Sequence, residues 1–283
     1  MRLSIILISW NSLVHLKECL ASLSYTLQKE DIEIIWVDNG STDGASRYVK
    51  ENYPQIQTVT LPCNQGVAYA RNRGIEKASG KYILLLDDDT IANENAIYGM
   101  VAYMDFHPET GICGCKLTNT QKETQKSDKE YPGLGIKFKN IFYTFIRRKN
   151  KEIFHTVEYE PEYLIGACQM IRREVLDLTG LLDENIFYGP EDADFCIRVR
   201  NNGFKIVYLP QFSIIHHWKR VTNRKIFSKL ACRHIQALLY FRNKYLFTSY
   251  RTRRSRHFIS MGKRLFSMGS WMYISSILKI HSS

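Results

Sequence analysis

Three consecutive aspartates, Asp87, Asp88 and Asp89, directly follow the aliphatic residues 83–86. Four aliphatic residues in a row are typical of a buried strand in a parallel sheet. Because open α/β sheets bind ligands beyond the carboxyl ends of their strands, we expect the aspartates at a binding edge. Neighbouring carboxylates repel one another, and a divalent cation such as Mg²⁺ or Mn²⁺ commonly joins carboxylates to a substrate diphosphate. The pattern indicates a cation site, although an acidic turn exposed to solvent is the alternative.

A second polar cluster, Asp38-Asn39-Gly40, ends another apolar run, and Ser9 ends the first apolar run of the chain. A carboxylate at the end of a strand is well placed to accept a hydrogen bond from a ribose hydroxyl or a base. Asn-Gly is also a strong turn dipeptide, and the turn and ligand interpretations are compatible. Neither a Gly-x-Gly-x-x-Gly sequence nor a Walker lysine motif follows the first strand, which disfavours dinucleotide cofactors and ATP hydrolysis.

Glu191 and Asp192 follow Pro190, a residue that suits the first turn of a helix. Acids in a first turn stabilise the positive end of the helix, so capping is one interpretation of the pair. The other is a general base, because an ionised carboxylate can take the proton of an attacking hydroxyl.

His216 and His217 end a short apolar segment. A histidine beside an acidic pocket can complete a metal coordination shell, although imidazole suits Mn²⁺ less well than oxygen does. A structural role for both histidines is the alternative.

The elements that must position these residues alternate between strand and helix patterns, which predicts an α/β fold with a mainly parallel central sheet and flanking helices. The expected strands are residues 3–9, 32–37, 57–61, 82–87, 111–117, 204–209 and 212–216, with a strand that enters a helix over 163–172. The expected helices are residues 13–27, 43–52, 67–78, 93–104 and 191–202. Residues 119–160 lose periodicity, which is typical of a functional loop.

The chain has 283 residues, and its net charge of +11 is distributed unevenly. Residues 1–218 carry 24 basic and 28 acidic side chains, whereas residues 219–283 carry 15 basic side chains and no acid. We therefore expect a domain over 1–218 and a basic, amphipathic helical extension over 219–283.

No signal peptide or apolar run long enough to span a membrane is visible, and the seven cysteines are expected to be reduced in a cytoplasmic protein.

The basic extension mixes Lys and Arg with aromatic and aliphatic residues, and residues 251–256 form its densest cationic segment. Such segments bind anionic lipid surfaces, and each basic residue contributes about 1 kcal/mol near the surface. Nucleic-acid binding and a solvated helix packed on the domain are the alternatives, because phosphate attraction needs only clustered cations. We favour the membrane surface and expect no nucleic acid.

Seven segments occur in the order found in one enzyme family. They are residues 4–11, 37–43, 61–66, 70–74, 84–89, 166–167 and 191–192. Over residues 3–218 the chain resembles the family 2 glycosyltransferases, and it is most similar to their bacterial rhamnosyltransferase- and galactofuranosyltransferase-like branch. The resemblance implies a GT-A fold and inverting transfer of a sugar from a nucleotide-diphosphate donor.

The resemblance also implies roles for individual side chains. A nucleotide pocket would be lined by polar residues, namely Ser9, Asp38, Asn39, Asn64, Arg71 and Asp88. Metal ligands would be Asp87, Asp89 and His216, with Mg²⁺ or Mn²⁺ bound. Asp192 would be the general base with Glu191 beside it, and Gly166 and Ala167 would contact the donor or acceptor sugar. Many relatives carry an acid at the position of Asn39, so the choice of nucleobase is left open.

The resulting hypothesis is a metal-dependent glycosyltransferase that uses dTDP-rhamnose or a UDP-sugar and acts in bacterial surface polysaccharide synthesis. Its acceptor would be a glycan or a polyprenyl-linked sugar at the inner face of the plasma membrane. Two alternatives stay open, a sugar nucleotidyltransferase and a nucleic-acid-binding protein that uses the basic extension.

Overall fold

A computed structural model describes residues 2–129, 131, 155–217 and 229–246 of the chain. The chain divides into two compact units, Met1–Leu239 and Tyr240–Ser283, and the fold that follows belongs to the first. The expected boundary after residue 218 stays a prediction, because residues 218–228 lie outside the described part. Most of the expected basic extension and residues 132–154 of the expected loop also lie outside it.

The first unit is built on one large sheet, whose strands run in the order β3-β2-β1-β4-β10-β6-β11-β5, with β7 paired to β6. These strands are β1 (Leu3–Ser9), β2 (Ile32–Asp38), β3 (Gln57–Thr60), β4 (Tyr82–Asp87), β5 (Thr90–Ile91), β6 (Thr110–Thr118), β7 (Thr124–Gln125), β10 (Cys168–Arg172) and β11 (Lys205–His216). A separate short pair joins β8 (Asp128–Lys129) to β9 (Tyr163–Leu164).

The sheet is mainly parallel, as expected, but one central strand runs the other way. β1 pairs in parallel with β2 and with β4, and β6 pairs in parallel with β11. β10 lies between β4 and β6 and is antiparallel to both. It follows β9 directly rather than a helical crossover, so nothing requires it to run with its neighbours.

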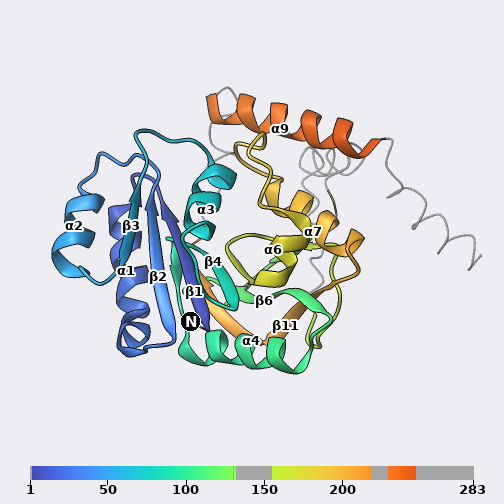
Figure 1. Cartoon of the computed structure of the whole chain (residues 1–283), viewed down its shortest axis with the longest axis horizontal. Helices are drawn as coiled ribbons and strands as arrows, with labels where there is room; N and C mark the ends of the chain where they lie inside the picture. The colour runs from blue at the N-terminus through green and yellow to red at the C-terminus, as the bar shows by residue number, and fades with distance from the viewer. Residues whose placement is uncertain (1, 130, 132–154, 218–228, 247–283) are drawn as a thin grey trace, which may run out of the picture. The chain divides into compact units, whose positions relative to one another are not determined.

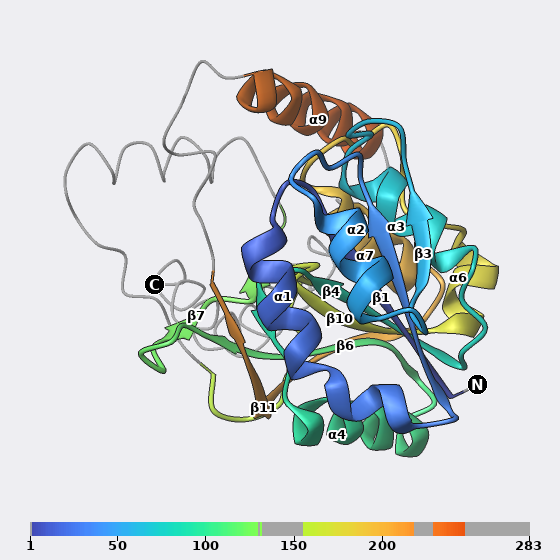
Figure 2. The same cartoon turned by 90° about the vertical axis from the view of Figure 1, so that its left-hand side faces the viewer.

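Helices cover both faces of the sheet (Figures 1 and 2). On one face, α1 (Leu13–Ser22), α2 (Ala45–Asn52) and α4 (Glu94–Phe106) pack with alternate residues of β1, such as Leu3, Ile5 and Leu7, in one core cluster. The other face carries α3 (Val67–Ile75), α6 (Arg173–Thr179) and α7 (Glu191–Asn201). Gly74 of α3 lies so close to Ile6 that a Cβ would overlap its side chain. Both faces of the central strands are therefore buried, which explains their continuous apolar runs.

Three elements differ from their predicted form. The expected helix over 13–27 ends at Ser22 and continues as a 3₁₀ helix, η1 (Ser24–Gln28). The expected strand over 163–172 is two strands, β9 and β10, separated by a turn. The two expected strands at 204–216 form one strand, β11, whose pairing with β6 is irregular between Leu209 and Ser213. Pro210 interrupts the apolar pattern there, because proline has no N–H for the ladder and is tolerated only at such irregular positions.

The described helices include α9 (Lys229–Leu246), and none of the described helices is both long and apolar enough to cross a membrane. All seven cysteines are free thiols; Cys63 and Cys232 are exposed and the other five are buried.

Leu84 in β4 tests the packing that holds the aspartates in place, because its side chain is fully buried in the core. Leu84→Ala is expected to lower the free energy of unfolding by about 2–5 kcal/mol, measured by urea denaturation. Leu178→Ala is the control, since Leu178 is 57% exposed on α6, and its change should stay within about 0.5 kcal/mol. Equal effects of the two substitutions would contradict the described core.

Candidate active site

The strand register brings the polar strand ends together at one edge of the sheet. Ser9 of β1 pairs with Asp38 of β2, and Ile8 pairs with Asp87 of β4. Because these three strands are parallel, their carboxyl ends point to the same edge. The structure thus brings the first two predicted groups of site residues side by side.

Asp38 and Ser9 are both buried and both take part in local hydrogen bonds. The Asp38 carboxylate accepts a hydrogen bond from the backbone N–H of Ser41 at 2.8 Å, which makes the expected turn. The Ser9 hydroxyl accepts one from the Trp36 indole at 2.9 Å. Each side chain retains acceptor capacity beyond these bonds, so the turn and ligand interpretations remain compatible.

Asn39 organises the loop that enters α3. Its amide nitrogen lies 3.2 Å from both the Asn64 side-chain oxygen and the Gly66 carbonyl, and its own oxygen accepts from the Gln65 backbone at 2.9 Å. A carboxylate at this position could not donate to Asn64 and Gly66. The amide at position 39 therefore fits this loop for structural reasons.

Arg71 lies at the centre of the site and is almost fully buried. Its guanidinium nitrogens reach Asp87 at 2.7 Å, the carbonyl of Gly166 at 2.8 Å and Glu191 at 3.3 Å. The structure brings Arg71 between the end of β4, the turn before β10 and the start of α7. Its expected role in closing the pocket around the base and diphosphate stays a prediction.

Gly166 must lack a side chain because of this arrangement. A Cβ at position 166 would overlap the Arg71 guanidinium, which is held by its two ion pairs. The neighbouring Ala167 is buried, and its carbonyl accepts a hydrogen bond from the Asp87 backbone at 3.2 Å. Gly166 and Ala167 therefore shape the site around Arg71 and Asp87.

Asp87, Asp89 and His216 place one ligand atom each within 4.8 Å of one another. The Asp89 carboxylate lies 3.2 Å from Nε2 of His216. On its other side, Nδ1 of His216 is 3.0 Å from the Gln125 side-chain oxygen, and the Gln125 amide donates to the His216 carbonyl at 2.8 Å. Without a cation, Nε2–H can donate to Asp89; once Nε2 is deprotonated and Nδ1 donates to Gln125, Nε2 would present its lone pair to a bound ion. Two carboxylates and one oriented imidazole fit Mn²⁺ or Mg²⁺.

The two aspartates differ in their electrostatic surroundings. Burial raises the pKa of Asp87, more than the Arg71 charge lowers it. Burial also acts on Asp89, but the hydrogen bond and charge of His216 outweigh it and lower the pKa of that carboxyl. Asp88 lies between them and is partly exposed.

Glu191 and Asp192 begin α7, as expected, but their environments differ. Glu191 is buried against Arg71, and burial together with the Asp192 charge raises its pKa to about 7. Asp192 is partly exposed, and its carboxylate accepts from the backbone N–H of Ala193 at 2.8 Å and of Gly166 at 3.3 Å. These two hydrogen bonds fix the carboxylate while leaving it partly exposed, so that it can be reached by an acceptor hydroxyl.

The loop before α7 is held by residues of α3 and α9 that no sequence pattern distinguished as site residues. Phe187 accepts a hydrogen bond through its carbonyl from Val67 of α3 at 2.8 Å, and the guanidinium of Arg233 lies 4.0 Å from its ring centroid. Nδ1 of His234 lies 3.0 Å from the carbonyl of Tyr188. Arg233 and His234 belong to α9, so basic residues of the predicted extension contact the segment that presents Glu191 and Asp192.

Gln125 is another site residue that the sequence did not reveal. It lies in the aperiodic segment 119–160, where no pattern distinguishes it from neighbouring polar residues. Only the pairing of β7 with β6 brings it beside His216.

The pKa of Glu191 gives a pH dependence that can be measured without substrate. Its carboxyl keeps a proton in the folded chain up to about pH 7, whereas in the unfolded chain it loses the proton near pH 4.5. The free energy of unfolding of the wild type, relative to Glu191→Gln, should therefore fall between about pH 4.5 and 7 and stay constant above that. Urea denaturation at a series of pH values, with chelator present, checks this. A flat difference across the range would contradict the environment described for Glu191.

The family model for glycosyl transferase family 2 matches residues 4–179 of the chain. The N-acetylglucosaminyl-diphospho-decaprenol L-rhamnosyltransferase of Mycobacterium tuberculosis is 24% identical over 264 residues, which cover 86% of this chain and 85% of that protein. The dTDP-rhamnosyl transferase RfbF of Shigella flexneri is 26% identical over 208 residues, covering 70% of this chain and 64% of that protein.

Solved structures share the fold. The mannosyltransferase PcManGT from Pyrobaculum calidifontis, in complex with GDP-Man and Mn²⁺, superposes with a TM-score of 0.55 at 18% identity and covers 78% of this chain and 58% of that one. Residues 1–349 of TarS from S. aureus superpose with a TM-score of 0.54 at 22% identity and cover 76% of this chain and 60% of that one. The expected GT-A fold and family are thereby confirmed, and the chain belongs to glycosyl transferase family 2.

Proposed function

We propose that this glycosyltransferase moves a sugar from a nucleotide-diphosphate donor to a hydroxyl of a glycan or lipid-linked acceptor, with inversion at the anomeric carbon. Rhamnose is the sugar best supported, because two relatives that each align with more than two thirds of this chain are named as rhamnosyltransferases. dTDP-rhamnose is therefore the first donor to test, followed by UDP-sugars. Bacterial surface polysaccharide synthesis is the corresponding process.

One observation carries this proposal. Three side chains that could hold a cation lie close together at the carboxyl ends of the strands, namely Asp87, Asp89 and His216. Arg71 contacts both Asp87 and Glu191, and Glu191 is the chain neighbour of Asp192. A donor diphosphate needs positive charge, and an acceptor hydroxyl needs a base. The chain offers groups for both needs at one edge of its sheet.

Asp192 acts as the general base in this proposal. Its partly exposed carboxylate takes the proton of the acceptor hydroxyl, whose oxygen then attacks the anomeric carbon from the face opposite the diphosphate. Hydrogen bonds from Gly166 and Ala193 hold the carboxylate in place. Buried Glu191 and Arg71 set the position of the first turn of α7, and no side chain of the chain is required as a nucleophile.

Asp87, Asp89 and His216 would hold Mg²⁺ or Mn²⁺, and the ion would stabilise negative charge on the leaving diphosphate as a Lewis acid. In this proposal the nucleoside of the donor is bound by Ser9, Asp38, Asn39 and Asn64. Asp88 lies nearer to the ribose or the sugar. Gly166 and Ala167 form the wall next to the sugar.

We also propose that the enzyme meets its acceptor at a membrane surface. The relative from M. tuberculosis is named for an acceptor carried on decaprenyl diphosphate. In α9 the apolar side chains of Ile235 and Leu239 are 53% and 47% exposed, and they lie one turn apart beside basic residues. Basic helices with exposed apolar residues bind anionic lipid surfaces. We propose that residues 219–283 hold the enzyme at the inner face of the plasma membrane, without binding nucleic acid.

The first experiment measures binding and hydrolysis of dTDP-rhamnose, UDP-sugars and GDP-sugars with Mn²⁺, with Mg²⁺ and with chelator. We expect metal-dependent preference for one donor.

Asp192→Asn should lower transfer to the acceptor about 10²–10⁴-fold, because a general base contributes that much. Donor binding should be retained in this variant, whereas Asp89→Asn should weaken metal-dependent donor binding.

Asp177→Asn is the matched control, because Asp177 is an exposed acid on α6 and belongs to none of the proposed groups of site residues. Transfer at the wild-type rate by Asp192→Asn would exclude Asp192 as the base. Binding of no donor with either metal would contradict the proposed activity, and transfer of a nucleotidyl group instead would favour a sugar nucleotidyltransferase.

A further inference from the structure

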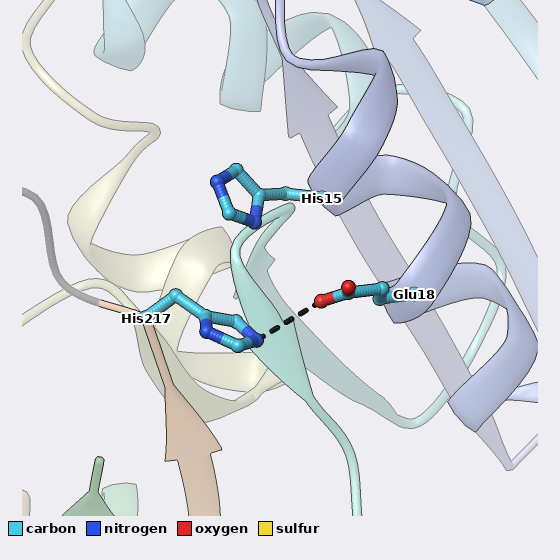
Figure 3. A group of neighbouring side chains, drawn as sticks. All are labelled: His15, Glu18 and His217. Atoms are coloured by element: carbon cyan, nitrogen blue, oxygen red, sulfur yellow. Dashed lines mark ion pairs between the residues drawn. The ribbon is translucent and has the colours of Figure 1, made fainter. Parts of the chain in front are cut away.

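A second cluster of metal-ligating side chains lies outside the site described above. His15 and Glu18 belong to α1, and His217 follows β11 (Figure 3). One ligand atom from each of the three residues lies within 4.8 Å of the others. Nε2 of His217 is 3.1 Å from the Glu18 carboxylate, and the rings of His15 and His217 have centroids 5.2 Å apart. Figure 3 shows the three side chains directed toward one another from two elements that are far apart in the sequence.

Ordered backbone holds these side chains together. His15 and Glu18 are three residues apart on a helix, so their side chains project from the same side of α1. His217 is fixed through its backbone N–H, which donates to the Asp89 carbonyl at 2.8 Å, directly after β11 pairs with β5. α1 in turn contacts β5. Helix and strand packing therefore hold the backbone of all three residues in place.

The donor atoms differ from those of the first cluster in a way that selects a different ion. Asp87, Asp89 and His216 offer two carboxylates and one imidazole, whereas His15, Glu18 and His217 offer two imidazoles and one carboxylate. Carboxylate oxygen suits Mg²⁺ and Mn²⁺, and imidazole suits Zn²⁺ and its neighbours in the transition series. Two histidines and one glutamate form a known protein ligand set for Zn²⁺, with water in the fourth position.

The distances are compatible with this ion. Ligand atoms about 2.0–2.1 Å from a tetrahedral Zn²⁺ lie about 3.3 Å from one another. The separation of 3.1 Å between His217 and Glu18 is already close to that value, and the His15 ligand atom, within 4.8 Å of both, would have to approach by no more than about 1.5 Å.

We propose that His15, Glu18 and His217 form a second cation site, separate from the Asp87, Asp89 and His216 cluster and selective for Zn²⁺-type ions. The bound ion ties α1 to the end of β11, one residue from His216. This proposal does not rest on the proposed sugar transfer, because it concerns binding of the metal alone.

The test uses the full chain carrying Asp89→Asn, which disables the first cluster, after treatment with chelator. Titration with ZnCl₂ in a calorimeter should show one ion bound per chain, and Zn²⁺ should raise the melting temperature. Adding His15→Gln or Glu18→Gln to this background should weaken Zn²⁺ binding tenfold or more and abolish the rise. Co²⁺ in place of Zn²⁺ should give the visible absorption of a nitrogen-rich site of low coordination number, lost in the same variants.

His155→Gln and Glu51→Gln in the same background are the matched controls, because both residues are exposed and belong to neither cluster. They should bind Zn²⁺ as the parent does. Circular dichroism before metal addition verifies that each variant is folded.

Absence of Zn²⁺ binding in Asp89→Asn while the wild type binds one ion would mean that both clusters share a single ion, which overturns the proposal. Binding unaffected by His15→Gln and Glu18→Gln would overturn it as well.

Discussion

The buried guanidinium of Arg71 is the interaction on which the site depends. It contacts Asp87 at 2.7 Å and Glu191 at 3.3 Å in surroundings almost closed to solvent. Without it, acids from β4 and α7 would repel one another at close range, and a buried carboxylate without a partner is costly. Arg71 therefore allows the proposed metal ligands and the proposed base to lie at one edge of the sheet.

The fold provides three supports around this side chain. β4 brings Asp87 to the edge of the sheet, and the turn between β9 and β10 brings the Gly166 carbonyl within 2.8 Å of the guanidinium. The antiparallel strand β10 is what places this turn there, since its first residue, Cys168, pairs with Leu86 of β4. The start of α7 supplies Glu191. Because no side chain fits at position 166, the closeness of this packing depends on glycine.

The sequence predicted the parts of this arrangement that local patterns encode. Apolar runs gave β1, β2 and β4, and their parallel pairing placed Ser9, Asp38 and Asp87 at one edge. The antiparallel direction of β10 was not predictable, because a buried apolar run looks the same in either direction. The burial of Arg71 was also hidden, since its two acidic partners lie 16 and 120 residues away along the chain.

The same limit applies to the histidines. Local patterns identified His216 and His217 as a pair, and the structure separates them into two clusters with different donor atoms. His216 is the last residue of β11 and His217 the first after it; His216 meets Asp89, whereas His217 meets Glu18. No sequence pattern identified His15 as a candidate metal ligand, because a single histidine within a helix does not differ from other polar residues. Its partner is known only once α1 and β11 are placed in space.

A double-mutant cycle between Arg71 and Glu191 tests the central role of Arg71 most directly. At pH 8 with chelator, Arg71→Met should lower the free energy of unfolding by about 3–5 kcal/mol, because it leaves buried Glu191 and partly buried Asp87 without their partner. Glu191→Gln should stabilise the Arg71→Met chain more than it stabilises the wild type, since it removes a negative charge that Arg71 compensates in the wild type. Equal effects of Glu191→Gln in both backgrounds, or an Arg71→Met chain as stable as the wild type, would contradict this account.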